Sequence, residues 1–364
     1  MWPRRVVRGA MLHRWYPSPM ALHHYIPQDR LRALVRAEAL PERCTGAVLF
    51  ADITGFTAMT ETLRHSLGER RGIEALSQQV NAVYDALIGE VERFDGSVIG
   101  FAGDAITCWF DASRVKPAQH AAHCARAMQS AMAGFAGLSV KVGLALGPAR
   151  RLAVGHPDIQ RLDALAGATV ARAVAGEALA QPGEVLLDEA CARALDLPPS
   201  AARHADDGHA FVPLPSAATW PDTAAAPDAD GGASPLPPPD ADGLRSWVLP
   251  FVYQRETASL GLFVTDVRPA TAVFVRFAGL DYDGDEQAST VLDELVCLAQ
   301  TTVQAHGGVL LEMTIGDKGS YFYCNFGAAQ VHEDDAARAV RAALSLQQIS
   351  QAAPHVALQI GVSS

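Results

Sequence analysis

The chain has 364 residues, of which 49% are hydrophobic and 19% are charged, and this length is sufficient for two domains with full hydrophobic cores. Its formal net charge of −11 at pH 7 argues against general binding to nucleic acid or to an anionic membrane surface. No stretch approaches the ~18 consecutive apolar residues that a membrane-spanning helix requires.

The six cysteines are scattered and form no CxxC or metal-binding spacing, which is typical of reduced thiols in a cytoplasmic protein. The N-terminus is basic but lacks the apolar stretch of a signal peptide. Residues 1–40 are predicted to be an N-terminal segment with one short amphipathic helix. Leu31, Leu34 and Val35 share a face of this helix, which is expected to pack on the domain that follows.

Two carboxylates stand where predicted strands end in the next part of the chain. The apolar run 47–51 leads into Asp52 and the small-residue turn 54–57, and Asp104 lies in a tight turn between two further strands. Carboxylates on neighbouring strand ends, beside free backbone N–H groups, suit hard cations that carry a phosphate. Each motif taken alone is also compatible with a plain structural turn.

The remaining pattern of this region indicates an α+β domain, predicted over residues 41–200. Helical spacing of apolar residues predicts three helices, and alternation predicts further strands, with helices packed over a largely antiparallel sheet. The predicted helices cover 73–94, 121–135 and 167–180; a strand covers 140–147, and a turn with an edge strand covers 182–187.

Residues 201–244 are rich in Pro, Ala and Asp and are predicted to be a linker, because they contain too few aliphatic residues to bury a core. Beyond them the first pattern returns over residues 245–364. Residues 49–56 align with 273–280, but Arg276 replaces Asp52. This second copy is therefore interpreted as a degenerate domain, and since the chain stops inside a predicted strand, as a C-terminally truncated one.

Two motifs closely resemble those of class III nucleotidyl cyclase catalytic domains: Phe-Ala-Asp-Ile-Thr-Gly-Phe-Thr and, further along the chain, Phe-Ala-Gly-Asp-Ala. The tandem arrangement resembles the soluble, bicarbonate-responsive adenylyl cyclases and their bacterial relatives. The resemblance implies two ferredoxin-like domains that pair within the chain, each an antiparallel sheet with packed helices. It also implies the conversion of a nucleoside triphosphate into a 3′,5′-cyclic monophosphate and pyrophosphate, as a step of intracellular signalling.

By this resemblance, Asp52, Asp104 and the carbonyl of Ile53 would bind two Mg²⁺ or Mn²⁺ ions. Nucleotide contacts would come from the turn after Asp52, from the residue before Asp104, and from the second domain. These expected nucleotide-binding residues are Thr54, Gly55, Phe56, Thr57, Gly103, Glu312 and Lys318.

The family also uses an Asn and an Arg, four residues apart on one helix, to stabilise charge at the α-phosphate. Here Ala171 and Ala175 occupy those positions. Arg172 is one residue out of register and is expected to lie on the surface or to face an anion, rather than to replace the missing Arg. The first domain therefore lacks this pair, and the second domain would have to supply it. This chain on its own is expected to be inactive.

The base of the nucleotide stays open at this point. Family membership favours ATP, whereas Glu312, in place of a base-reading Lys, suits the N–H groups of guanine. Lys318 either turns toward the nucleotide or faces solvent. Gly100 replaces a Lys of the bicarbonate-responsive enzymes, which argues against activation by that anion.

Two functions remain after these comparisons: a two-metal nucleotidyl cyclase, and a regulatory pseudo-cyclase that binds nucleotide without turnover. Proteins with the tandem layout usually continue into an ATPase module and helical repeats, which the resemblance implies for a longer form of this protein.

Overall fold

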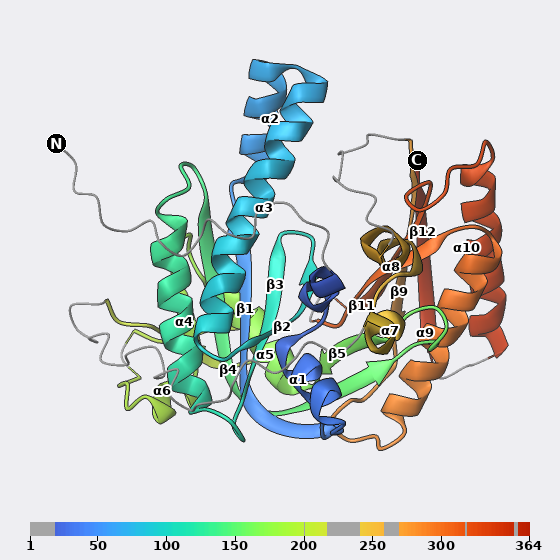
Figure 1. Ribbon diagram of the computed structural model, residues 1–364. Coiled ribbons are helices and arrows are strands. Elements are labelled where there is room, and N and C mark those ends of the chain that lie inside the picture. The colour runs from blue at the N-terminus through green and yellow to red at the C-terminus, as the bar shows by residue number, and fades with distance from the viewer. Residues whose placement is uncertain (1–18, 200, 217–240, 258–268, 317–318, 353–355) are drawn as a thin grey trace.

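The computed structural model describes residues 19–199, 201–216, 241–257, 269–316, 319–352 and 356–364. Within them the chain forms two sheets that lie side by side, the first at the left and centre and the second at the right of Figure 1. No helix in these ranges combines the length and the apolar character needed to cross a bilayer.

The first sheet has eight strands in the order β2-β3-β1-β4-β6-β8-β7, with β5 paired to β4. Its pairings are antiparallel apart from β4 with β6, as expected for an α+β domain. The strands are β1 (Arg43–Thr54), β2 (Ser97–Ala102), β3 (Ala105–Asp111), β4 (Ser139–Val154), β5 (Leu162–Ala166), β6 (Val185–Asp188), β7 (Arg203–His204) and β8 (Ala210–Pro213).

Helices cover both faces of this sheet. The first face packs against α3 (Glu69–Arg93) and α4 (Pro117–Met132), whose apolar residues include the fully buried Leu87 and Met128. The opposite face packs against α5 (Ala168–Leu179) around the buried Trp109. The three helices predicted from periodicity are therefore present. Two further helices are α2 (Phe56–Leu67) and α6 (Glu189–Ala194).

The structure differs from the sequence prediction in two ways in this region. The strand predicted at an edge is β6, which lies inside the sheet between β4 and β8. Strand β8 comes from residues assigned to the linker, because a short apolar stretch there, Ala210 to Val212, is long enough to pair with β6 and be buried. The central part of the predicted linker, residues 217–240, lies outside the described residues.

The second sheet has four strands in the order β10-β11-β9-β12, and all its pairings are antiparallel. Its strands are β9 (Thr271–Ala278), β10 (Val309–Thr314), β11 (Ser320–Phe326) and β12 (Ala357–Ser363), with helices α9 (Ala288–Ala305) and α10 (Asp335–Ala352). Buried residues of both helices, such as Val296 and Leu346, pack on one face of this sheet.

The hairpin of β4 and β5, here called the arm, joins the two halves. Leu152, Val154 and Ala164 of the arm belong to the hydrophobic core of the second half. At the tip of the arm, the Gly155 N–H donates to Oδ1 of Asp293 on α9 at 2.8 Å. The arm therefore attaches the middle of α9 to the first sheet.

A small cluster of helices packs beside the arm. It comprises η1 (Pro19–Tyr25), α1 (Gln28–Arg36), α7 (Ala241–Leu244), η2 (Arg245–Trp247) and α8 (Pro250–Thr257). Leu22, Ile26, Leu244 and Trp247 form its buried core, so segments from both sides of residues 217–240 meet here. Helix α1 confirms the short N-terminal helix predicted from the sequence, and it contacts β2.

The six cysteines are all free thiols, and four of them are buried, in agreement with the reduced cysteines predicted from their spacing.

Candidate active site

Asp52 and Asp104 lie together at one end of the first sheet. Asp52 is near the end of β1 and pairs across the ladder with Ala105 of β3, the residue that directly follows Asp104. The Ile53 N–H donates to the backbone carbonyl of Asp104 at 3.3 Å, which holds the β2–β3 turn against the end of β1. The antiparallel pairing thus brings together two carboxylates about fifty residues apart in the sequence.

The electrostatics of Asp52 show that negative charge is concentrated here. Its pKa is raised, first because burial disfavours the charged carboxylate, and then because the charges of Asp104 and Glu177 repel it. Lys141 acts in the opposite direction and lowers this pKa. The positive charge of Lys141 therefore only partly balances the negative charge of these carboxylates.

Lys141 and Glu177 are members of this cluster that sequence reasoning missed. Lys141 pairs with Asp52 in the β1–β4 ladder, and its Nζ lies 3.7 Å from Oδ2 of Asp52. The same ammonium group forms an ion pair with Glu177, a buried residue of α5. The only sequence signal was a basic residue in the predicted strand 140–147, opposite the strand that carries Asp52.

The turn after Asp52 has the geometry of an anion-binding helix start. Gly55 adopts φ 106° as the residue that precedes α2, and no side chain caps the first N–H groups of this helix. A Cβ at Gly55 would lie 2.3 Å from the carbonyl oxygen of Gly137, so only glycine fits. Phe56 and the exposed Thr57 begin the helix, whose uncapped amides are free to meet a phosphate.

The side chain of Thr54 supports the start of this turn. Its Oγ1 lies 2.6 Å from Oγ of Ser139 and 3.3 Å from the Ser139 carbonyl oxygen, so the hydroxyl ties β1 to the start of β4. The structure therefore gives this side chain a structural contact, and the backbone amides of the turn remain the candidate phosphate ligands.

Tyr84 of α3 closes the other side of the cluster. Its hydroxyl donates to the carbonyl oxygen of Gly103 at 3.1 Å, and Gly103 adopts φ 64° in the β2–β3 turn. The pKa of Tyr84 is raised to about 12 by burial and by the charges of Asp104, Asp52 and Glu312. Carboxylates from both sheets thus raise the pKa of Tyr84. The sequence had indicated only that it belongs to the apolar face of its helix.

Glu312 reaches this region from the second sheet. It lies on β10 at an irregularity of the β10–β11 ladder, and Gly100 lies at the matching irregularity of the β2–β3 ladder. Both residues line a cavity of about 380 Å³ between the sheets, together with Phe101 and Met313. Burial raises the pKa of Glu312, while a hydrogen bond from Thr314 Oγ1 at 3.0 Å lowers it.

The two alanines of α5 are not among the residues that line the cavity with Glu312. Ala171, in the first turn of the helix, lines a different cavity of about 360 Å³ that is formed with residues 277–283 of the second half. Ala175 is one turn further along and packs with the small cluster around Phe211. Neither carries a polar group, so this helix offers no side chain of the expected pair.

Arg172 does not replace the missing arginine. Its Nε donates to Oδ2 of the buried Asp188 at 3.0 Å, and its Nη2 donates to the Leu146 carbonyl oxygen at 3.1 Å. The guanidinium is thus bound to its own domain, which corrects the expectation that it lies on the surface or faces an anion. Lys318 lies outside the described residues.

In the second sheet, Arg276 stands where the repeat places a metal-binding carboxylate. It is exposed and donates to Oε1 of Gln359 at 3.3 Å. Within the residues that the structure describes, no group of three or more His, Cys, Asp or Glu side chains has metal-binding geometry.

Residues 41–213 match the family model of the "Adenylate and Guanylate cyclase catalytic domain". This match identifies a class III adenylate and guanylate cyclase catalytic domain in the first half of the chain. Over most of its length the chain is related to adenylate cyclase type 10.

The chain is 24% identical to adenylate cyclase type 10 of Oryctolagus cuniculus over 350 residues, which cover 88% of this chain and 22% of that protein. The Homo sapiens protein is 23% identical over 350 residues, with the same two shares. The chain thus spans 22% of the length of these relatives. Among solved structures, the adenylyl cyclase CyaB from P. aeruginosa is similar, with a TM-score of 0.40 and 19% identity, over 48% of this chain and 95% of that one.

Proposed function

We propose that this chain is the nucleotide-binding catalytic region of a nucleotidyl cyclase, which converts a nucleoside triphosphate into a 3′,5′-cyclic monophosphate and pyrophosphate. The observation that carries the proposal is the convergence of Asp52 and Asp104 beside the uncapped start of α2. Carboxylates bind divalent cations, free amides bind phosphates, and a metal–triphosphate complex requires both at one place.

The residues present fit two Mg²⁺ or Mn²⁺ ions. Asp52 and Asp104 are hard oxygen donors. Burial, and then the charge of Asp104, raise the pKa of Asp52, and a cation would relieve the repulsion between the two carboxylates. The Ile53 carbonyl is a further oxygen donor next to Asp52. When bound, such ions would favour ionisation of the attacking hydroxyl and neutralise charge on the phosphates.

The chain's own groups would bind and orient the substrate. The amides of residues 55–57 would hold the terminal phosphates at the N-terminus of α2. The carboxylate of Glu312 would contact the base from the opposite sheet, so the two sheets would hold opposite ends of one nucleotide. This division requires that the sheets pair within the chain, and it assigns a ferredoxin-like cyclase domain to each.

Two substrates are each favoured by one observation. The related adenylate cyclases favour ATP. The carboxylate of Glu312, held by Thr314, accepts hydrogen bonds and favours the N1–H and N2–H₂ groups of guanine. We place ATP first on family grounds and treat GTP as the alternative that Glu312 supports.

A second candidate function is a regulatory pseudo-cyclase, which binds nucleotide and does not turn it over. It is favoured by Ala171 and Ala175, by the engagement of Arg172 with Asp188, and by Arg276 at the second carboxylate position. In the enzyme, the Asn and Arg pair would come from the helix of the second domain equivalent to α5. Because the chain spans 22% of its relatives, we propose that it is part of a longer protein with an ATPase module and helical repeats.

Calorimetry of the purified chain with ATP and with GTP, each with and without Mn²⁺, tests the proposal. Saturable binding that requires Mn²⁺ is expected, and the absence of binding to either nucleotide would contradict both candidate functions. Cyclic nucleotide production by a form that includes the missing pair would separate the enzyme from the pseudo-cyclase.

A further inference from the structure

A loop of the second half, residues 279–287 between β9 and α9, lies against the first half and is here called the docking loop. In the internal repeat it corresponds to the candidate phosphate-binding turn, because Gly279 aligns with Gly55. Both glycines have positive φ, 110° and 106°, so the two segments share this backbone feature, although a helix follows Gly55 at once and α9 begins only at Ala288. The residues that follow differ in chemistry: Asp281, Asp283 and Asp285 make the docking loop acidic and unsuited to a phosphate.

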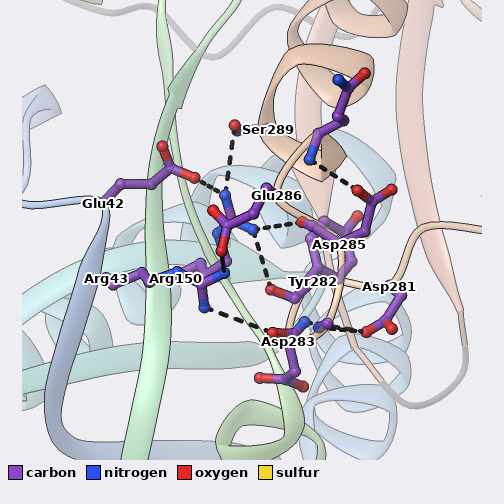
Figure 2. A network of polar contacts seen from close by, with 11 residues as sticks. Glu42, Arg43, Arg150, Asp281, Tyr282, Asp283, Asp285, Glu286 and Ser289 are labelled. Atoms are coloured by element: carbon purple, nitrogen blue, oxygen red, sulfur yellow. Dashed lines mark hydrogen bonds and ion pairs between the residues drawn. The ribbon is translucent and has the colours of Figure 1, made fainter.

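Arg150 of β4 is the centre of the contacts to this loop. Its side chain is only 3% exposed. Nη1 donates to the carbonyl oxygens of Asp285, at 2.7 Å, and Tyr282, at 3.4 Å, while Nη2 pairs with the carboxylate of Glu42. Figure 2 shows the guanidinium between Glu42 on one side and the docking loop on the other. One planar cation thus binds both halves of the molecule.

Asp283 makes a second attachment at the start of α5. Its Oδ2 accepts a hydrogen bond from the Ala168 N–H at 2.8 Å, where a carboxylate also opposes the positive end of the helix dipole favourably. A Cβ at the neighbouring Gly167 would lie 2.8 Å from Oδ1 of Asp283, so the close approach requires glycine there. A third contact, between Arg43 and Glu286, is exposed on both sides, with side chains 49% and 81% accessible.

The position of this joint connects it to the candidate active site. In the first sheet, β4 carries both Arg150 and Lys141, and Lys141 pairs with Asp52. On the other side, the docking loop continues from β9, which is joined through β11 to β10 and Glu312. The arm attaches the middle of α9, whereas Arg150 contacts Ser289 near its beginning. Arg150 therefore adds an attachment at the beginning of α9 to the one that the arm makes further along the helix.

We propose that Arg150 and Asp283 are positioning residues, which fix the second sheet on the first through the docking loop and thereby place Glu312 opposite Asp52 and Asp104. The second repeat has kept the positive-φ glycine of the phosphate-binding element, and the loop that follows this glycine holds the two halves together. The link to Glu312 rests on the proposed function, whereas the joint itself does not.

Pulsed electron–electron double resonance tests the joint directly. Spin labels would be attached at Ser130→Cys on α4 and Leu344→Cys on α10, two exposed positions, after Cys44 and Cys297 are changed to Ser. The unmodified joint is expected to give one narrow distance. Arg150→Met should give a broad or shifted distribution with an unchanged far-ultraviolet circular dichroism spectrum. A distribution identical to that of the unmodified joint would overturn the proposal.

Two matched variants make the test specific. Arg43→Gln removes the exposed contact at the same joint and should leave the narrow distance unchanged. Arg150→Lys keeps the charge but loses the planar fork, so it should behave like Arg150→Met; a narrow distance in the Lys variant would show that charge alone is sufficient and would overturn the role given to the carbonyl contacts. If Arg150→Met fails to fold, Asp283→Ala tests the joint from its other side with the same expected broadening.

A double-mutant cycle adds the link to the site. If Arg150 positions Glu312, the effect of Glu312→Lys on the ratio of ATP to GTP affinity should largely disappear in an Arg150→Met background. Additive effects of the two changes would refute the link. Failure of the unmodified chain to bind nucleotide would refute the proposed function, and the distance measurement would still decide the joint.

Discussion

Lys141 and Asp52 face each other on neighbouring strands, with 3.7 Å between Nζ and Oδ2, and the same ammonium group also pairs with Glu177. Lys141 is thus the cation that partly balances the charge of three carboxylates, Asp52, Glu177 and Asp104. A single positive charge leaves this cluster negative, and a divalent cation would complete the compensation.

The first prediction follows from this charge imbalance. Asp52→Asn and Asp104→Asn should each weaken Mn²⁺-dependent nucleotide binding by roughly 10- to 100-fold, the scale of losing a contact to a charged group. The melting temperature of the metal-free protein should stay the same or rise, because each change removes part of the repulsion. Calorimetry and thermal unfolding measure the two effects. Asp85→Asn, an exposed carboxylate of α3, is the control and should change neither. Unaltered nucleotide affinity in both site variants would rule out the metal assignment.

The second prediction concerns the base. Glu312→Lys should shift the preference between nucleotides toward ATP by ~1–3 kcal/mol, because a Lys donates where the carboxylate accepted. Competition between ATP and GTP for the Mn²⁺-loaded chain measures this shift. Glu294→Lys, at an exposed position of α9, adds the same charge change away from the cavity and should leave the preference unchanged. An ATP preference that Glu312→Lys does not alter would remove Glu312 from the site.

The third prediction is a pH dependence that Glu312 causes. Burial raises its pKa above the usual 4.5, so between 4.5 and the raised value the folded state keeps a proton that the unfolded state releases. The free energy of unfolding therefore falls as the pH rises through this window, and Glu312→Gln, which cannot ionise, should lack that fall. Urea unfolding at steps from about pH 4 to about pH 7 measures the difference between the two proteins. A difference that is constant with pH, or that grows in favour of the unmodified protein as the pH rises, would contradict the prediction.

The fourth prediction concerns the buried charges that attach α1 to the arm. Arg151 is 3% exposed, and its Nη2 donates to both carboxylate oxygens of Asp29, at 2.8 and 3.0 Å, and lies 3.4 Å from Asp163. Arg151→Ala would leave these carboxylates buried without this cation, which should lower the free energy of unfolding by about 3–5 kcal/mol. Denaturant unfolding measures it. Arg193→Ala removes an exposed ion pair with Glu189 and should cost no more than ~1 kcal/mol. Equal losses in the free energy of unfolding in the two variants would show that the buried cluster contributes no more to stability than an exposed ion pair.

Local pattern predicted much of this molecule. The apolar run before Asp52, the spacing of α3 and the turn at Asp104 are encoded by neighbouring residues, and the helices and carboxylates were placed correctly from them. Lys141 and Tyr84 could not be found in this way, because what brings them to Asp52 is strand pairing and helix packing between distant segments. For the same reason, β8 was assigned to a linker: its burial depends on pairing with β6, which its own composition does not show.

The last prediction concerns turnover. Restoring the family's pair with Ala171→Asn and Ala175→Arg is expected to give no cyclic nucleotide, because the first turn of α5 faces the docking loop and Arg276 holds the carboxylate position of that half. The unmodified chain should also be inactive, since the loss of even one donor of this type costs ~10²–10³ in rate, and a homodimer would carry the same alanines.

Production of cyclic AMP and cyclic GMP, with Mg²⁺ and with Mn²⁺, is the measurement for both proteins, and Asp52→Asn in the same assay gives the background. Turnover above that background by the unmodified chain would show that the transition-state residues lie elsewhere. Turnover gained only in the double variant would show that α5 reaches the nucleotide held by Asp52 and Asp104, against the arrangement of the two cavities described above. The expected result is that both proteins are inactive but bind nucleotide in the presence of Mn²⁺. Asp52, Asp104 and the amides of residues 55–57 would then supply the metal and phosphate contacts, while no group would stabilise the charge that develops at the α-phosphate.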